Sequence, residues 1–75
     1  MTCKQIEREA ALLARNAIAS ARENGSRTPE YDAIHMVDDT RTVVDICGCE
    51  HLGYLSTSDL KKIANAAMLL LENAS

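Results

Sequence analysis

The 75-residue sequence has no tryptophan, no phenylalanine and only two tyrosines, so its core lacks the large aromatic side chains that dominate many protein interiors. Hydrophobic residues still make up 47% of the chain, which excludes the sparse composition of a disordered protein. Leu, Ile, Val, Met and Ala must therefore fill a thin core with closely packed helices. At this length we expect one hydrophobic core and a single domain over residues 1–75.

Long hydrophobic runs are also absent. The longest, residues 66–71, is far shorter than a membrane span, and no apolar segment of the kind found in secretory signals opens the chain. Three cysteines, an odd number, are typical of a protein kept in a reducing compartment. We expect a cytoplasmic protein without disulfides, cofactor or membrane contact.

Positive charge is scarce in the middle of the chain, although the net charge of the whole is only −3. Between residues 30 and 50 a single Arg41 stands among the acidic residues Glu30, Asp32, Asp38, Asp39, Asp45 and Glu50. Nucleic-acid affinity depends on clustered Lys and Arg, so this pattern argues against direct nucleic-acid binding. It favours a protein partner with a basic patch.

Two helices are predicted, one at each end of the chain. Thr2 and Gln5 form a capping-box pattern before a helix over residues 3–24, which Gly25 ends. Ser56 and Asp59 cap the second helix in the same way. Its apolar stripe consists of Leu60, Ile63, Ala64, Ala67, Leu70 and Leu71.

Short strands are predicted between the helices. A three-residue loop at residues 39–41 pairs the strand that begins near Tyr31 with one through Val43 and Val44, and a turn at residues 48–50 leads to a third strand ending at Leu55. This register places Met36 opposite Val44, Ile34 opposite Ile46, Ile46 opposite Leu52 and Val44 opposite Tyr54. The predicted fold is α+β: α-β-β-β-α, a three-stranded antiparallel meander with two helices packed on one face.

Metal ligands alternate along the predicted sheet at Cys47, Cys49 and His51. Structural zinc sites need four such ligands, usually as two separated pairs, and this chain offers one cluster. The alternative is that both cysteines are small, half-buried residues and that His35 pairs with Asp45 across the sheet.

Cys47, a histidine and Asp45 supply the residue types of nucleophilic catalysis. A three-stranded meander on so small a domain offers no pocket that could exclude water from them. We therefore predict that the protein is not an enzyme.

Arg8, Arg15 and Arg22 recur every seven residues and form one basic stripe along the first helix. The stripe is either a solvated face, paired locally with Glu7, Glu9 or Glu23, or a docking edge for an acidic partner.

The second helix is apolar around most of its circumference at residues 68–71. A helix in a two-layer domain buries one side, so we expect a homodimer with Met68, Leu69 and Leu71 at its interface. Alternatively, the first helix or the chain end covers this surface.

The order of a helix, the Tyr31 strand, the Asp38–Asp39 turn, the Val43–Val44 strand, the Tyr54 strand and a capped final helix resembles small phage-encoded anti-CRISPR proteins. The resemblance is to the acidic, DNA-mimicking inhibitor of a type I-F surveillance complex. It implies action in the bacterial host cytoplasm. The chain differs in being far less acidic, and its second helix is apolar.

The resulting hypothesis is a non-enzymatic inhibitor that docks an acidic sheet and turn surface onto a bacterial nucleic-acid-handling complex. The expected binding residues are Asp32, Asp38, Asp39, Asp45 and Glu50. The alternative is a homodimeric regulatory or scaffolding module that uses the second helix, and a lesser one is a small metal-binding module.

Overall fold

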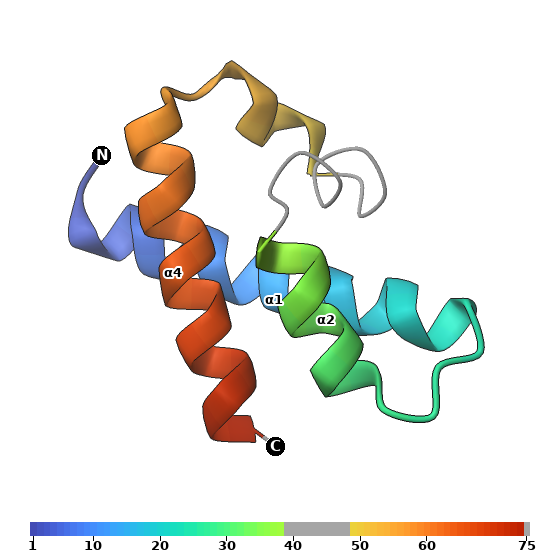
Figure 1. Ribbon diagram of the computed structural model, residues 1–75. Helices are drawn as coiled ribbons and strands as arrows, with labels where there is room; N and C mark the ends of the chain where they lie inside the picture. The colour runs from blue at the N-terminus through green and yellow to red at the C-terminus, as the bar shows by residue number, and fades with distance from the viewer. Residues whose placement is uncertain (39–48, 75) are drawn as a thin grey trace.

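The computed structural model describes residues 1–38 and 49–74, and every element in these ranges is helical. The elements, in chain order, are α1 (Cys3–Glu23), α2 (Pro29–Asp38), the 3-10 helix η1 (Glu50–Tyr54) and α4 (Thr57–Ala74) (Figure 1). No strand occurs in the described residues. The prediction of an α+β fold with a three-stranded meander is therefore wrong.

Helix α1 begins and ends as its sequence predicts. The Thr2 hydroxyl accepts a hydrogen bond from the Gln5 backbone N–H at 3.2 Å, and the Gln5 side chain accepts one from the Thr2 N–H at 2.8 Å. Gly25 follows the helix with a φ of 81°, which side chains disfavour, and its N–H donates to the Arg22 carbonyl. Local sequence thus determines both ends of this helix.

Helix α2 stands where the first strand was predicted. Pro29 occupies the first helical position, where its missing N–H costs nothing, and acidic residues in the first turn complement the helix dipole. The buried residues Ala33 and Val37 are four apart, as are Tyr31 and His35, whose rings meet edge to face at 4.7 Å. The apolar residues of this segment also fitted the alternation of a strand, but they follow the period of a helix.

The predicted third strand is also wrong, because residues 50–54 form η1. Two backbone hydrogen bonds between residues three apart form its tight turns. The Leu52 N–H donates to the Cys49 carbonyl at 2.9 Å, and the Leu55 N–H donates to the Leu52 carbonyl at 3.1 Å. The turn buries Cys49 and Leu52 in the core. The predicted strand through Val43 and Val44 lies outside the described residues.

Helix α4 follows the prediction for the C-terminal part of the chain. The Ser56 hydroxyl accepts a hydrogen bond from the Asp59 N–H at 3.2 Å at its start. Asp59 in the first turn also suits the positive end of the helix dipole.

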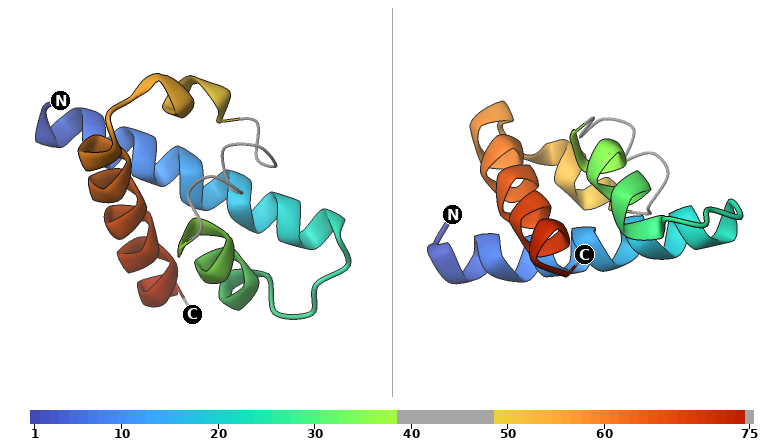
Figure 2. Two further views of the ribbon diagram at one scale, coloured as in Figure 1. Left: turned by 45° about the horizontal axis from the view of Figure 1, so that its top comes forward. Right: turned by 60° about the horizontal axis from the view of Figure 1, so that its bottom comes forward.

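All other described elements pack on one side of α1. Figure 2 shows α2, η1 and α4 above α1 in its right-hand view, with the opposite side of α1 uncovered by them. The Cα atoms extend over 34 × 24 × 15 Å. The smallest of these extents, 15 Å, is the thickness of two layers of helices. The core residues are Ala10, Leu13, Ala14, Ala17, Ala33, Val37, Cys49, Leu52, Ile63, Ala64, Ala67 and Leu71.

Enlarging a buried alanine of α1 tests this close packing. Ala17 is fully buried, so Ala17→Leu should lower the free energy of unfolding by about 1–3 kcal/mol through overpacking. Ala19→Leu on the exposed side of the same helix is the matched control and should change it little. Equal urea midpoints for both variants and the parent would contradict the packing.

Candidate interaction surface

An apolar groove lies between α1 and the C-terminal half of α4. It encloses about 420 Å³, and we call it the α1–α4 groove. Its lining consists of Glu7, Ala10, Ala11, Ala66, Leu69, Leu70 and Asn73. Alanines from both helices form its shallow part, and the two leucines are the large apolar side chains beside them. It is thus an apolar surface with a polar residue from each helix among its lining.

The phase of α4 explains why these leucines are exposed. Ile63, Ala67 and Leu71 are four residues apart and are buried against the other helices. At 100° per residue Leu70 falls at the edge of that stripe and Leu69 on nearly the opposite side of the helix, and they remain 46% and 61% exposed. Two adjacent, half-exposed leucines are costly in water, so this face is a candidate binding surface.

The three residues predicted at the dimer interface, Met68, Leu69 and Leu71, differ in how exposed they are. Leu69 is exposed in the α1–α4 groove, whereas Leu71 is 1% exposed and belongs to the core of its own chain. Met68 is partly buried and packs against the core. Leu70, assigned from sequence to the buried stripe, lines the groove instead. A register of i, i+4, i+8 anchored on Ile63 would have made this distinction.

The predicted acidic surface is only partly described. Asp32 lies in the first turn of α2, where its carboxylate accepts a hydrogen bond from the Ser26 hydroxyl, which in turn accepts one from the Thr28 N–H. Asp38 is exposed at the other end of the same helix. Asp39 and Asp45 lie outside the described residues, as does the side chain of Glu50. Asp32 therefore has a local structural role, and neither described aspartate is on a sheet.

The predicted metal ligands are not brought together as far as the structure describes them. Cys49 is buried and its sulfur accepts a hydrogen bond from the Asn16 amide at 3.4 Å. His51 points to α1, with Nε2 at 2.7 Å from Glu9 Oε2. Cys47 lies outside the described residues, and within them no group of three such side chains could hold a metal. Cys49 and His51 therefore connect the η1 segment to α1, each through a hydrogen bond.

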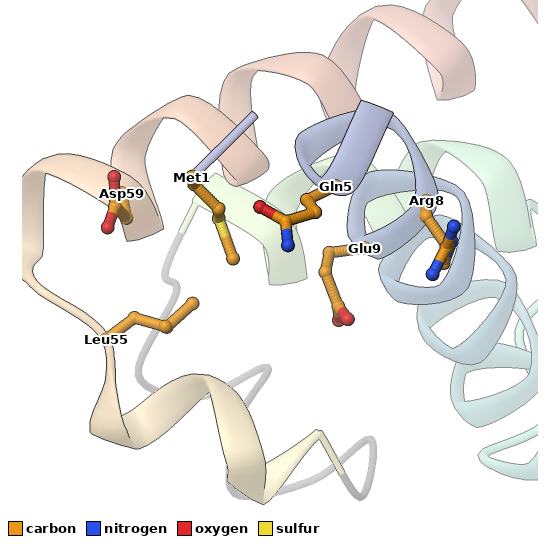
Figure 3. A pocket seen from close by; sticks show the side chains of 6 residues that line it. All are labelled: Met1, Gln5, Arg8, Glu9, Leu55 and Asp59. Carbon is orange, nitrogen blue, oxygen red and sulfur yellow. The ribbon is translucent and has the colours of Figure 1, made fainter. Parts of the chain in front are cut away.

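A second hollow, of about 390 Å³, opens at the N-terminal end of α1. Figure 3 shows Met1, Gln5 and Glu9 on one side of it and Leu55 on the other, with Arg8 and Asp59 at its margins. Among the described residues its lining includes no cysteine, serine or histidine. Cys47 and Asp45, considered from sequence as parts of a catalytic constellation, lie outside the described residues.

The basic stripe on α1 is solvent-exposed at Arg8, Arg15 and Arg22. Within the described part of the chain no ion pair joins these arginines to Glu7, Glu9 or Glu23, and Glu9 pairs with His51 instead. The local pairing of these arginines with the glutamates of α1 is thus missing from the described residues.

Across the described residues, no helix has the length and apolar character needed to cross a membrane. Comparisons with protein-family models, curated proteins and solved structures give no match. The resemblance to anti-CRISPR proteins therefore stays a prediction, and two of the strands on which it rested, at Tyr31 and Tyr54, are helical.

Replacing Asp32 and Asp38 one at a time tests whether Asp32 stabilises the start of α2. Asp32→Ala removes the acceptor of the Ser26 hydroxyl and a favourable charge in the first turn of α2, so we expect a loss of about 1 kcal/mol in unfolding free energy. Asp38→Ala, at the C-terminal end of the same helix, is the control and should leave stability unchanged or slightly raised. The reverse order in urea unfolding would contradict this assignment.

Proposed function

We propose that the protein is a non-enzymatic interaction module that forms a homodimer through the α1–α4 groove. The supporting observation is that one surface carries both a shallow alanine-lined hollow and the two exposed leucines Leu69 and Leu70. A two-fold axis through the groove brings the leucines of each copy against the alanines of the other. Such a patch is self-complementary, as an isologous interface requires.

The side chains beside the groove are compatible with a second copy. Among the described lining residues Glu7 carries the single charge, and Asn73 is the other polar side chain. Polar residues around an apolar centre are typical of protein interfaces, which exclude charge from the centre more than from the rim. In the proposed dimer, helices of the two copies therefore pack against each other through the apolar side chains of the α1–α4 groove.

The expected dimer is weak. Burying a whole leucine side chain contributes about 1.5–3 kcal/mol, so four half-exposed leucines contribute on the order of 3–6 kcal/mol. Association costs at least about 4 kcal/mol in lost freedom, so the alanines and flanking side chains must contribute as well. The leucines alone leave at most about 2 kcal/mol, and a Kd of about 1 mM corresponds to about 4 kcal/mol, so with the further contribution of the alanines we expect the dimer at millimolar rather than micromolar concentrations.

Dimerisation suits a regulatory or scaffolding role, because two copies present each remaining surface twice. We place this role in the cytoplasm, since three cysteines without an expected disulfide suit a reducing compartment. The inhibitor hypothesis stays a prediction. Of its five residues, Asp38 has an exposed side chain in the described structure, while Asp32 is held by Ser26.

Charge placed in the groove tests the proposal. Leu69→Glu and Leu70→Glu should each shift the protein to a single-copy mass in sedimentation equilibrium at about 0.1–1 mM, because a carboxylate would be desolvated at the interface. Both sites are exposed in the single chain, so folding should be unaffected.

Leu12→Glu is the matched control, since Leu12 is an exposed leucine on α1 outside the groove lining. It should retain the association of the parent protein. A parent that keeps a single-copy mass at about 1 mM, or groove variants that associate as the parent does, would overturn the proposal.

A further inference from the structure

The side of α1 that faces away from the other described helices has a regular pattern. Residues on it follow one another at spacings of four, three, four and three, and all of them are exposed. They are Arg8, Leu12, Arg15, Ala19 and Arg22. Any single face of an α-helix has this spacing, and a coiled coil meets its partner through such a face; the feature particular to this one is that arginines alternate with Leu12 or Ala19. We call this set the outer seam of α1.

The core-facing side of α1 uses the same spacing, at Ile6, Ala10, Leu13 and Ala17, of which the last three are buried. Helix α1 therefore has two seams on opposite sides, and the intramolecular helices occupy one of them (Figure 2). We propose that the outer seam binds an acidic amphipathic helix of another protein in a coiled-coil-like arrangement.

Charge complementarity determines the partner. The outer seam alternates an arginine with Leu12 or Ala19, and no ion pair neutralises its arginines within the described residues. A partner helix that fits must place Asp or Glu opposite the arginines and apolar residues opposite Leu12 and Ala19. Arginine suits such sites because its planar fork can hold a carboxylate through two hydrogen bonds.

A second copy of this chain does not fit the outer seam. In a parallel, in-register pair of α1 helices each seam arginine would face the same arginine of the other copy, and in an antiparallel pair centred on Arg15, Arg8 would face Arg22, so like charges would meet in every arginine layer of these two arrangements. The α1–α4 groove is therefore the surface for self-association, and the outer seam is available for a different chain. This inference does not rest on the dimer.

A nucleic acid is the other polyanion to consider, and the pattern favours it less. Phosphate binding is served by continuous positive charge, whereas the outer seam places apolar side chains between its arginines. Successive arginines lie about 10.5 Å apart along the axis, which is the repeat of a heptad on a partner helix.

The test uses two designed helical peptides of about four heptads with leucine in alternate core layers. The acidic peptide has Glu in the other layers and the basic peptide has Lys there. Fluorescence anisotropy at about 0.05 M salt should show the acidic peptide binding at least about tenfold more tightly than the basic one, with the difference shrinking at about 0.5 M salt. Equal affinities, or no binding of the acidic peptide, would overturn the proposal.

A charge exchange supplies the specific control. The variant Arg8→Glu, Arg15→Glu, Arg22→Glu keeps good helix formers on an exposed face, so circular dichroism should be unchanged. Its affinity for the acidic peptide should fall roughly tenfold or more, and it should bind the basic peptide more tightly than the acidic one. A variant that loses one peptide without gaining the other would contradict pairing through the outer seam.

Two further measurements separate the alternatives. Arg27→Glu changes a charge in the loop after α1 and should leave the peptide preference intact. Leu69→Glu removes the proposed dimer contact and should also leave it intact, so failure of one proposal is distinguishable from failure of the other. Tighter binding of a DNA duplex of about 20 bp than of the acidic peptide would overturn the proposal and assign the seam to phosphates.

Discussion

The close approach of helices over the alanines of α1 is the constraint on which the rest of the structure depends. Ala10 and Ala17 are fully buried, and the main partners across them are α2 and α4, whose own buried alanines lie in the same core. Small side chains let a chain without Phe or Trp fill its interior at ordinary density. They also leave little depth in the core, so the large apolar residues at the end of α4 cannot all be buried in one chain.

Both candidate surfaces follow from the position of α1. Because α2, η1 and α4 all pack on one side of it, its outer seam stays exposed (Figure 2). Because α4 packs through Ile63 and Leu71, Leu70 lies at the edge of that contact and Leu69 on the side of the helix away from it. One surface is apolar, and we propose that it binds its own copy, while the other carries the arginines of the outer seam. A module of this kind could bring two copies of one acidic helix together.

The sequence predicts the two long helices well, because Thr2, Gln5 and Ser56 make local hydrogen bonds that do not depend on the rest of the fold. It fails at residues 29–38 and 50–54, which are helical where strands were predicted. Ile34 and Met36 fit alternation as well as helical spacing over so few residues, and the sign that should have weighed more is Pro29 before two acidic residues. Leu71 rather than Leu70 continues the stripe of every fourth residue from Ile63, but the choice of Ile63 as its anchor depends on how α4 is rotated against α1, which the tertiary packing sets.

The most direct test of self-association is an isotope-filtered NMR experiment on a mixture of labelled and unlabelled protein at about 1 mM. The proposed interface predicts nuclear Overhauser contacts between copies, from the methyl group of Ala11 to the methyl groups of Leu69 and Leu70. Contacts between copies that involve other surfaces, or none at a concentration where sedimentation shows two copies, would contradict it.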